Sequence, residues 1–211
     1  QIVDSLLSGK DVLCIMPTGA GKSVCYQVPA LIFDGVTIVV SPLISLMKDQ
    51  VGSLVQSGVA AAYINSSLSP NQYAKVLKNT VAGKYKIIYV APERLATPEF
   101  LDVCEKVNIS LIAVDEAHCV SQWGQDFRPS YLKITEFISS LSRRPIVGAF
   151  TATATDEVKA DIARILQLHN PFMITTGFDR PNLFFGVEKP NSKPIKLLEL
   201  VQERSGRSGI I

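Results

Sequence analysis

The fold is decided by the stretch Val12–Ser23, which reads VLCIMPTGAGKS. Its apolar first half, Val12–Met16, predicts a buried strand. The glycines that follow allow a tight turn, which points several backbone N–H groups at one spot. A helix that begins near Lys22 adds the positive end of its dipole to the same spot. The sequence therefore predicts a phosphate-binding loop between a strand and a helix.

Each residue of this loop has an expected task. Lys22 reaches the β- and γ-phosphates of a nucleotide, and the Ser23 hydroxyl holds Mg²⁺. The other residues expected to bind the nucleotide are Thr18, Gly19, Ala20 and Gly21. The usual pattern, G-x-x-x-x-G-K-[ST], is not fully met, because Met16 stands where the first glycine belongs. The alternative is a glycine-rich turn that binds nothing.

The composition excludes several classes of protein. The chain has 211 residues, of which 47% are hydrophobic and 19% charged, so it can bury a core and disorder is not expected. A net charge of +2 is too small for a wholly basic surface, so any nucleic-acid site must be a local patch. The four cysteines form no C-x-x-C pair, which favours free thiols in the cytosol. No apolar run reaches membrane-spanning length and no signal peptide is visible, so no membrane partner is expected.

Apolar, β-branched runs alternate with helical patterns along the chain, which predicts an α/β fold. Because the runs are apolar throughout, we expect a mostly parallel sheet with helices on both faces. Ligands of such sheets lie at the carboxyl ends of the strands. The expected strands are Val12–Met16, Val36–Ser41, Ala61–Asn65, Lys86–Ala91, Leu111–Asp115, Ile146–Thr151 and Phe172–Thr176. The expected helices are Lys22–Phe33, Leu43–Ser57, Pro70–Ala82, Pro98–Glu105, Pro129–Ser140 and Glu157–Leu166.

The pattern changes after Thr176. We expect residues 1–176 to form one N-terminally truncated domain, and residues 177–211 to be a linker and the start of a second domain. A turn-rich connector at 177–182 is followed by a possible short strand, Leu183–Val187, and a helix, Ile195–Glu203. The chain opens inside a helical pattern and closes on Ser208–Ile211, which is typical of a new strand. The expectation is therefore a piece of a longer protein.

A second chemical motif follows the apolar run Leu111–Val114. It begins with Asp115, a carboxylate delivered by a buried strand, which is typical of a Mg²⁺ ligand in phosphoryl-transfer sites. The next residue, Glu116, is placed to orient and deprotonate an attacking water. His118 is either a hydrogen-bonded structural histidine or a link from the nucleotide site to its surroundings. The alternative for the acids is a solvated pair, and a metal site of His118 with Cys119 is disfavoured because no partner pair has zinc-ligand spacing.

The chain with these two motifs resembles the first RecA-like motor domain of superfamily-two helicases, which has a P-loop NTPase fold. Further segments narrow the resemblance to the RecQ-type DNA helicases, and the stretch after Asp-Glu-Ala-His is the most specific of them. The segments that carry it are Met16–Ser23, Ser41–Gln50, Ala91–Leu95, Asp115–Cys119, Ser121–Pro129 and Thr151–Thr155.

The resemblance implies an ATP-dependent DNA helicase that moves 3′ to 5′ and acts in DNA repair and recombination. ATP and Mg²⁺ are the implied cofactors, with Lys22, Asp115, Glu116 and His118 as catalytic residues. The implied partners are single-stranded DNA, duplex DNA with a single-stranded tail, and a second RecA-like domain beyond Ile211 that supplies an arginine finger. The implied location is the bacterial cytoplasm, at the nucleoid, or a eukaryotic nucleus.

The resemblance also assigns residues to DNA binding and coupling. Ser41 and Lys48 are candidates to grip DNA phosphates, against an ordinary strand-to-helix turn. Arg94 either contacts phosphate or pairs with an acid.

Val120–Pro129 resembles the aromatic-rich loop of the RecQ type, which is thought to sense single-stranded DNA and to signal to the ATP site. Its candidates are Gln122, Trp123, Phe127 and Arg128, and the alternative is that the two aromatic residues cover the core. Thr151 and Thr153 are expected to relay the nucleotide state, and a helix N-cap at Thr155 is compatible with that.

Two departures from the family pattern matter. Ala20 replaces a usual glycine of the phosphate loop, and one methyl group there should still permit binding. Gln1 lies too close to the first helix to be the family's adenine-reading glutamine, so it is not assigned. Two rival functions stay open: a superfamily-two ATPase directed by RNA, and a nucleotide-binding lobe without turnover of its own.

Overall fold

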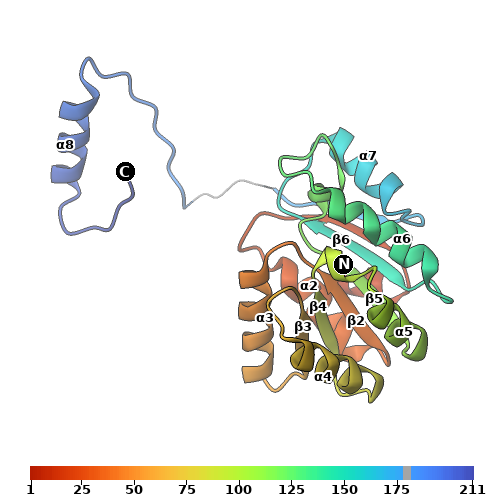
Figure 1. Ribbon diagram of the computed structural model, residues 1–211. Coiled ribbons are helices and arrows are strands. Elements are labelled where there is room, and N and C mark those ends of the chain that lie inside the picture. Colours follow the sequence, from red (N-terminus) through yellow and green to blue (C-terminus); the bar gives the residue numbers. More distant parts are fainter. Residues whose placement is uncertain (178–181) are drawn as a thin grey trace. The chain divides into compact units, whose positions relative to one another are not determined.

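The computed structural model describes residues 1–177 and 182–211 (Figure 1). The chain divides into two compact units, Gln1–Phe178 and Asp179–Ile211, and each is described by itself. In the described residues, no helix combines the length and apolar character needed to cross a membrane. All four cysteines are free, and three of them are buried, as expected from the sequence.

The first unit is built on a seven-stranded sheet with the order β3-β4-β2-β5-β6-β1-β7. Every strand pair in it is parallel. All seven predicted strands are confirmed, each within two residues of its expected ends. Their bounds are β1 (Val12–Ile15), β2 (Val36–Val40), β3 (Ala61–Ile64), β4 (Ile87–Val90), β5 (Ile109–Val114), β6 (Ile146–Thr151) and β7 (Phe172–Thr175).

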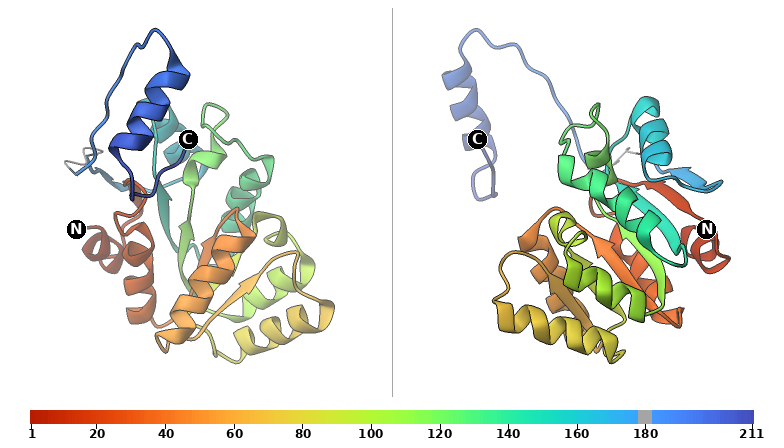
Figure 2. Two further views of the ribbon diagram at one scale, coloured as in Figure 1. Left: turned by 90° about the vertical axis from the view of Figure 1, so that its left-hand side faces the viewer. Right: turned by 45° about the vertical axis from the view of Figure 1, so that its right-hand side comes forward.

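Helices cover both faces of the sheet (Figure 2), as the continuous apolar runs predict. Within β1, Leu13 and Ile15 pack on one side, whereas Val12 and Cys14 pack on the other. One face holds α1 (Ile2–Leu7), α2 (Lys22–Ile32) and α3 (Ile44–Gln56). The other holds α4 (Pro70–Val81), α5 (Pro98–Lys106), α6 (Lys133–Ser140) and α7 (Asp156–Ile165).

Local chemistry sets the helix ends. The single helix expected over Pro129–Ser140 begins instead with a 3₁₀ turn, η3 (Pro129–Leu132), before α6. Two further 3₁₀ turns are η1 (Pro92–Arg94) and η2 (Ala117–Val120). The N-cap expected at Thr155 is confirmed, because its hydroxyl accepts the Val158 N–H at 3.3 Å.

The strand order brings the predicted motifs together. Because all strands are parallel, the segments that follow β1, β2, β5 and β6 leave the same edge of the sheet. Ile15 of β1 lies beside Thr151 of β6, and Val40 of β2 lies beside Val114 of β5. The phosphate loop, Asp115 and Thr151 therefore share the carboxyl edge.

The amino edge carries a buried ion pair that the sequence did not predict. Asp11, which is 3% exposed, accepts from Arg144 Nη2 at 2.6 Å and from Arg144 Nη1 at 3.2 Å. It also accepts the backbone N–H groups of Val147 at 2.9 Å and His169 at 2.7 Å. One carboxylate thus joins the start of β1 to the start of β6 and to the segment before β7.

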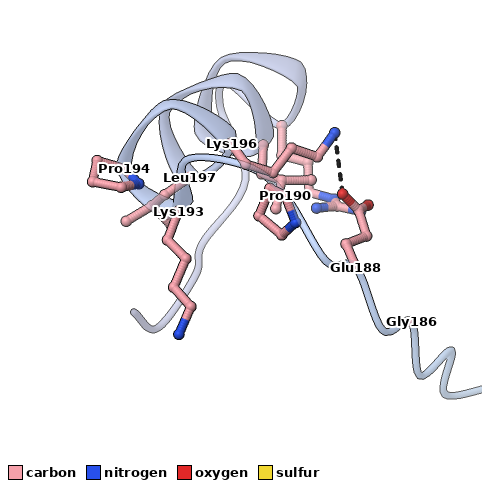
Figure 3. A pocket seen from close by; sticks show the side chains of 9 residues that line it. Gly186, Glu188, Pro190, Lys193, Pro194, Lys196 and Leu197 are labelled. Atoms are coloured by element: carbon pink, nitrogen blue, oxygen red, sulfur yellow. Dashed lines mark ion pairs between the residues drawn. The ribbon is translucent and has the colours of Figure 1, made fainter.

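The second unit contains α8 (Lys193–Glu203), which confirms the helix expected there. In described residues 182–211, Leu183–Val187 and Ser208–Ile211 form no strand, so both strand predictions are wrong. A strand needs a neighbour for its backbone hydrogen bonds, and this unit offers none. The connector expected at 177–182 lies mostly outside the described residues. A pocket of about 650 Å³ lies against α8, where Lys196 pairs with Glu188 at 3.2 Å (Figure 3).

Candidate nucleotide site and the loop joined to it

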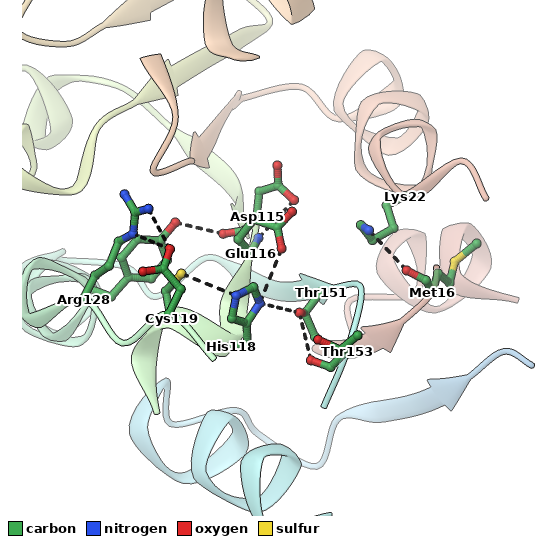
Figure 4. A network of polar contacts seen from close by, with 11 residues as sticks. Met16, Lys22, Asp115, Glu116, His118, Cys119, Arg128, Thr151 and Thr153 are labelled. Carbon is green, nitrogen blue, oxygen red and sulfur yellow. Dashed lines mark hydrogen bonds and ion pairs between the residues drawn. The ribbon is translucent and has the colours of Figure 1, made fainter. Parts of the chain in front are cut away.

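The phosphate loop has the backbone that its glycines permit. Gly19 and Gly21 take φ values of 84° and 87°, in the left-handed region that other residues avoid. Gly21 then caps α2, whose first residue is Lys22. Lys22 Nζ donates to the carbonyl oxygen of Met16 at 3.2 Å, so the ammonium group lies over its own loop (Figure 4). Thr18, Gly19, Ala20 and Gly21 are exposed, and Ser23 is half-buried.

The two departures from the usual loop pattern have a structural reason. Neither Met16 nor Ala20 is among the described residues with positive φ, so neither position requires glycine. Met16 continues the pairing of β1 with β6, because its N–H donates to the Thr151 carbonyl at 3.0 Å. The methyl group of Ala20 is exposed, and the Ala20 N–H donates to the Pro17 carbonyl at 3.1 Å within the loop.

Asp115 is a buried carboxylate with little to stabilise its charge. Its side chain is 6% exposed, and Oδ1 accepts one hydrogen bond, from the Glu116 N–H at 3.0 Å. In the described residues, no cationic side chain forms an ion pair with it. Burial first, and the Glu116 carboxylate second, raise its pKa from 3.8 to about 6, although the Glu116 N–H and the Lys22 charge oppose the shift.

Glu116 turns the chain sharply after β5. Its φ of 48° is left-handed, a conformation that costs a non-glycine residue of order 1–3 kcal/mol. Its Oε2 lies 3.4 Å from Nδ1 of His118. The same Nδ1 is 2.7 Å from the Thr151 hydroxyl, which donates to the Thr153 carbonyl at 3.2 Å (Figure 4). His118 thus links the acid pair to the end of β6, in agreement with the linking role considered from the sequence.

These hydrogen bonds fix the tautomer of a neutral His118. Since the Thr151 hydroxyl hydrogen goes to Thr153, its oxygen must accept, and Nδ1 therefore carries the proton. Nε2 is then the acceptor and faces Cys119 Sγ at 3.8 Å. Burial raises the pKa of the Cys119 thiol to about 12, so the thiol keeps the hydrogen that it offers.

The aromatic-rich loop, Val120–Pro129, is called the Trp123 loop below. Trp123 is 70% exposed, so it does not cover the core. Gln122 is also exposed, and Phe127 is half-buried. Arg128 pairs with Asp126 at 2.6 Å and donates to the Pro42 carbonyl at 3.3 Å, which ties the loop to the turn after β2. An exposed indole held by an ordered loop is suited to stack on an unpaired base.

The remaining candidates divide by exposure. Ser41 is fully buried and its hydroxyl has no partner in the described residues, so it cannot contact DNA directly here and keeps only the coupling role. Lys48 and Thr153 are exposed. The Arg94 guanidinium lies over the Tyr73 ring, 5.4 Å from its centroid, and forms no ion pair with a described residue, so the acid pairing is wrong.

Sequence reasoning missed two residues that fix this edge. Buried Tyr131 donates to the Asp115 carbonyl at 3.0 Å, and Asp161 of α7 accepts from the Ser121 hydroxyl at 2.8 Å. No local sequence pattern predicts the hydrogen bond of Tyr131 to Asp115. Asp161 had a weak signal, because it is an acid beside the apolar stripe of Val158 and Ile162.

The site fits a divalent cation at Asp115. A buried carboxylate with one hydrogen bond and no described ion pair is an oxygen ligand of the kind that Mg²⁺ prefers. The Ser23 hydroxyl, at the start of α2, is a second oxygen donor. No cluster of three acidic, histidine or cysteine side chains that would suit another metal occurs in the described residues.

Comparisons with known proteins agree with this geometry. Residues 1–161 match the model of the DEAD/DEAH box helicase family. The chain is 48% identical over 202 residues to the ATP-dependent DNA helicase RecQ of Bacillus subtilis, covering 96% of this chain and 34% of that protein. It is 44% identical over 211 residues to the enzyme of the same name from Pasteurella multocida, covering 100% of this chain and 33% of that one. The chain thus spans about one third of these relatives, and the resemblance to the RecQ type is confirmed.

Solved structures show the same fold. The helicase domain of Hef from Pyrococcus furiosus matches with a TM-score of 0.64 at 18% identity, covering 86% of this chain and 37% of that one. The helicase MrfA, solved with DNA and AMPPNP, matches with a TM-score of 0.65 at 19% identity, covering 83% of this chain and 26% of that one. The predicted RecA-like α/β fold is confirmed.

Proposed function

The chain belongs to the DEAD/DEAH box helicase family, and on that premise we propose that it is the ATP-binding motor lobe of a RecQ-type DNA helicase. The whole protein would move 3′ to 5′ along single-stranded DNA and unwind duplexes in DNA repair and recombination. One observation carries the proposal: the phosphate loop and Asp115 share an edge of the sheet with His118, which connects them to the loop that exposes Trp123.

The residues divide the reaction among them. Lys22 leaves the Met16 carbonyl to bind the β- and γ-phosphates, while the backbone N–H groups of the loop hold the nucleotide. Asp115 and Ser23 would hold Mg²⁺, which when bound neutralises phosphate charge. Glu116 orients the attacking water and accepts its proton. The charged groups and the fixed geometry supply most of the rate.

His118 supplies a connection between hydrolysis and DNA. Its Nδ1 lies near both Glu116 and Thr151, so a movement of either residue changes what the imidazole bonds. The adjacent Cys119 carbonyl accepts the Arg128 N–H at 2.9 Å, which carries the connection into the Trp123 loop. We expect single-stranded DNA that stacks on Trp123 to favour the hydrolytic position of Glu116.

The test is ATP hydrolysis by the protein that carries this chain with its second motor domain. We expect single-stranded DNA to stimulate hydrolysis strongly, and Lys22→Ala to abolish it. Lys10→Ala is the matched control, because Lys10 is exposed at the opposite edge of the sheet. Turnover retained by Lys22→Ala would refute the assignment, and stimulation by RNA in place of DNA would favour the RNA-directed rival.

A second variant tests the DNA sensor. Trp123→Ala should weaken stimulation by DNA and leave nucleotide binding intact, because base stacking contributes roughly 1–3 kcal/mol per base. Trp123→Phe keeps an aromatic face and should retain most of the response. If Trp123→Ala responds to DNA as the wild type does, the sensor role is wrong.

A further inference from the structure

The Trp123 loop is held at its first turn by helix α7. The Ser121 hydroxyl donates to Asp161 Oδ2 at 2.8 Å. The Ser121 hydroxyl oxygen in turn accepts the backbone N–H of Trp123 at 3.2 Å. Ser121 is fully buried, so water does not compete for its hydroxyl. One carboxylate of α7 thus orients the group that fixes the backbone at Trp123.

Asp161 is itself held in place. Its other oxygen, Oδ1, pairs with Arg164 Nη2 at 2.6 Å, one turn along the same helix. The Arg164 guanidinium, followed by the Ser121 hydroxyl, lowers the pKa of the Asp161 carboxyl, which is therefore ionised at neutral pH. Hydrogen bonds to a charged acceptor are about twice as strong as neutral ones.

Apolar packing holds the loop at its first residue, because Val120 is buried in the same core cluster as Val158 and Ile162 of α7. A pocket of about 240 Å³ lies between the loop and α7, lined among others by Trp123, Phe127, Asp161 and Arg164. Beyond Val120, the Ser121–Asp161 hydrogen bond is the one hydrogen bond between the loop and α7 among the described residues. Removing it should free the loop without opening the core.

Helix α7 also reaches the nucleotide edge. It begins after the cap at Thr155, four residues beyond Thr151, whose hydroxyl bonds to His118. Val158 and Ile162 bury the inner face of α7 in the core. The Thr151–Thr155 segment therefore leads directly into the helix that carries Asp161.

We infer that Asp161 is a positioning residue for the Trp123 loop, and that α7 forms a second connection between the nucleotide edge and that loop, beside the His118–Cys119 route. The positional half of this inference stands on the contacts alone. The coupling half rests on the proposed function.

The positional half is tested on the 211-residue chain, because Trp123 is its only tryptophan. Asp161→Ala and Ser121→Ala should lower the fluorescence anisotropy of Trp123 and raise its quenching by acrylamide. Asp161→Asn keeps an acceptor oxygen and should stay near the wild type. Asp156→Ala is the matched control, since this aspartate lies on the same helix with its side chain 99% exposed.

Circular dichroism identifies variants that do not fold. If Asp161→Ala does not fold, Ser121→Ala is used for the test instead. A folded Asp161→Ala chain, or in its absence a folded Ser121→Ala chain, with the anisotropy and quenching of the wild type would overturn the positional half.

The coupling half is tested by DNA-stimulated ATP hydrolysis in the protein with both motor domains. For Asp161→Ala, the DNA concentration that gives half-maximal stimulation should rise about tenfold, the loss of one charge-assisted hydrogen bond. The rate without DNA should not change, and Asp161→Asn should restore most of the response. A wild-type DNA response from Asp161→Ala would overturn this half alone. If DNA does not stimulate even the wild type, the proposed function fails with it, while the fluorescence result still decides the positional half.

Discussion

The two edges of the sheet each bury an aspartate, and the protein treats the two carboxylates in opposite ways. Asp11, at the amino edge, is 3% exposed and accepts hydrogen bonds from Arg144, Val147 and His169. Asp115, at the carboxyl edge, is 6% exposed and accepts a single hydrogen bond, from Glu116. Both aspartates lie at an edge of the same parallel sheet. They differ in the number of groups that donate hydrogen bonds to each carboxylate.

The difference separates stability from function. A buried charge that is fully paired locks its surroundings, whereas a buried charge left without a cation is costly until a ligand arrives. The amino edge therefore stabilises the fold, because its buried carboxylate is fully paired. The carboxyl edge keeps an unfavourable carboxylate beside the phosphate loop, which is understandable if a nucleotide with its metal ion completes it.

The largest effect on stability should come from removing the Asp11–Arg144 ion pair. Asp11→Ala leaves Arg144 without its carboxylate partner and two backbone N–H groups unsatisfied, so we expect a loss of about 3–5 kcal/mol in the free energy of unfolding. Urea unfolding of the chain measures it. Asp34→Ala, at an exposed aspartate near the same edge, is the control and should change little. A loss below about 1 kcal/mol for Asp11→Ala would remove the structural role.

Asp115→Asn should raise the free energy of unfolding at neutral pH, whereas Asp11→Ala lowers it. The pKa of Asp115 is about 6 in the folded chain against an ordinary 3.8, so the folded state binds the proton more tightly. Its contribution to stability is complete below pH 3.8 and is lost as the pH rises through 6. The variant should therefore be more stable than the wild type by up to about 3 kcal/mol at pH 7 and equal to it near pH 4.

The pH series itself is the check on this prediction. Unfolding curves for both chains between pH 4 and pH 7, without nucleotide, give the difference in free energy of unfolding at each pH. A difference that does not vary with pH, or a less stable variant at pH 7, would show that burial of the Asp115 carboxylate does not destabilise the fold.

Two glycines extend the comparison to the backbone. A Cβ at Gly35, just before β2, would clash with the Asn108 carbonyl oxygen, and a Cβ at Gly124 would clash with that of His118. Gly35→Ala should cost about 1–3 kcal/mol, because β2 is fixed between β4 and β5. Gly124→Ala should cost less stability, since the Trp123 loop can shift, but should weaken the response to DNA. Equal losses of stability would contradict this contrast.

The smallest effect should come from the cap of α7. Thr155→Ala removes the hydroxyl that accepts the Val158 N–H, and should lower the free energy of unfolding by about 1 kcal/mol. Thr155→Ser keeps the hydroxyl and should stay near the wild type. If both variants lose the same amount, the methyl group of Thr155 rather than its hydroxyl stabilises this point.

The sequence predicts what depends on neighbouring residues. Apolar runs predict the seven strands, and the short polar segments that follow two of them predict both motifs. These signals are local, because burial and turn chemistry act over a few residues. It could not predict contacts that only the fold creates: Arg144 lies 133 residues from Asp11, and Asp161 lies 40 residues from Ser121. The strand expected at Leu183–Val187 failed for the same reason, since β-branched and aromatic composition indicates a strand only where a neighbouring strand pairs with it.

The most direct test of the account is the rate of ATP hydrolysis by Asp115→Asn in the protein with both motor domains, with saturating single-stranded DNA. We expect a loss of at least about a hundredfold, because the group that would hold the metal ion is gone, in a protein that is more stable at pH 7. Hydrolysis near the wild-type rate would contradict it, because the unpaired carboxylate would then have no part in the reaction.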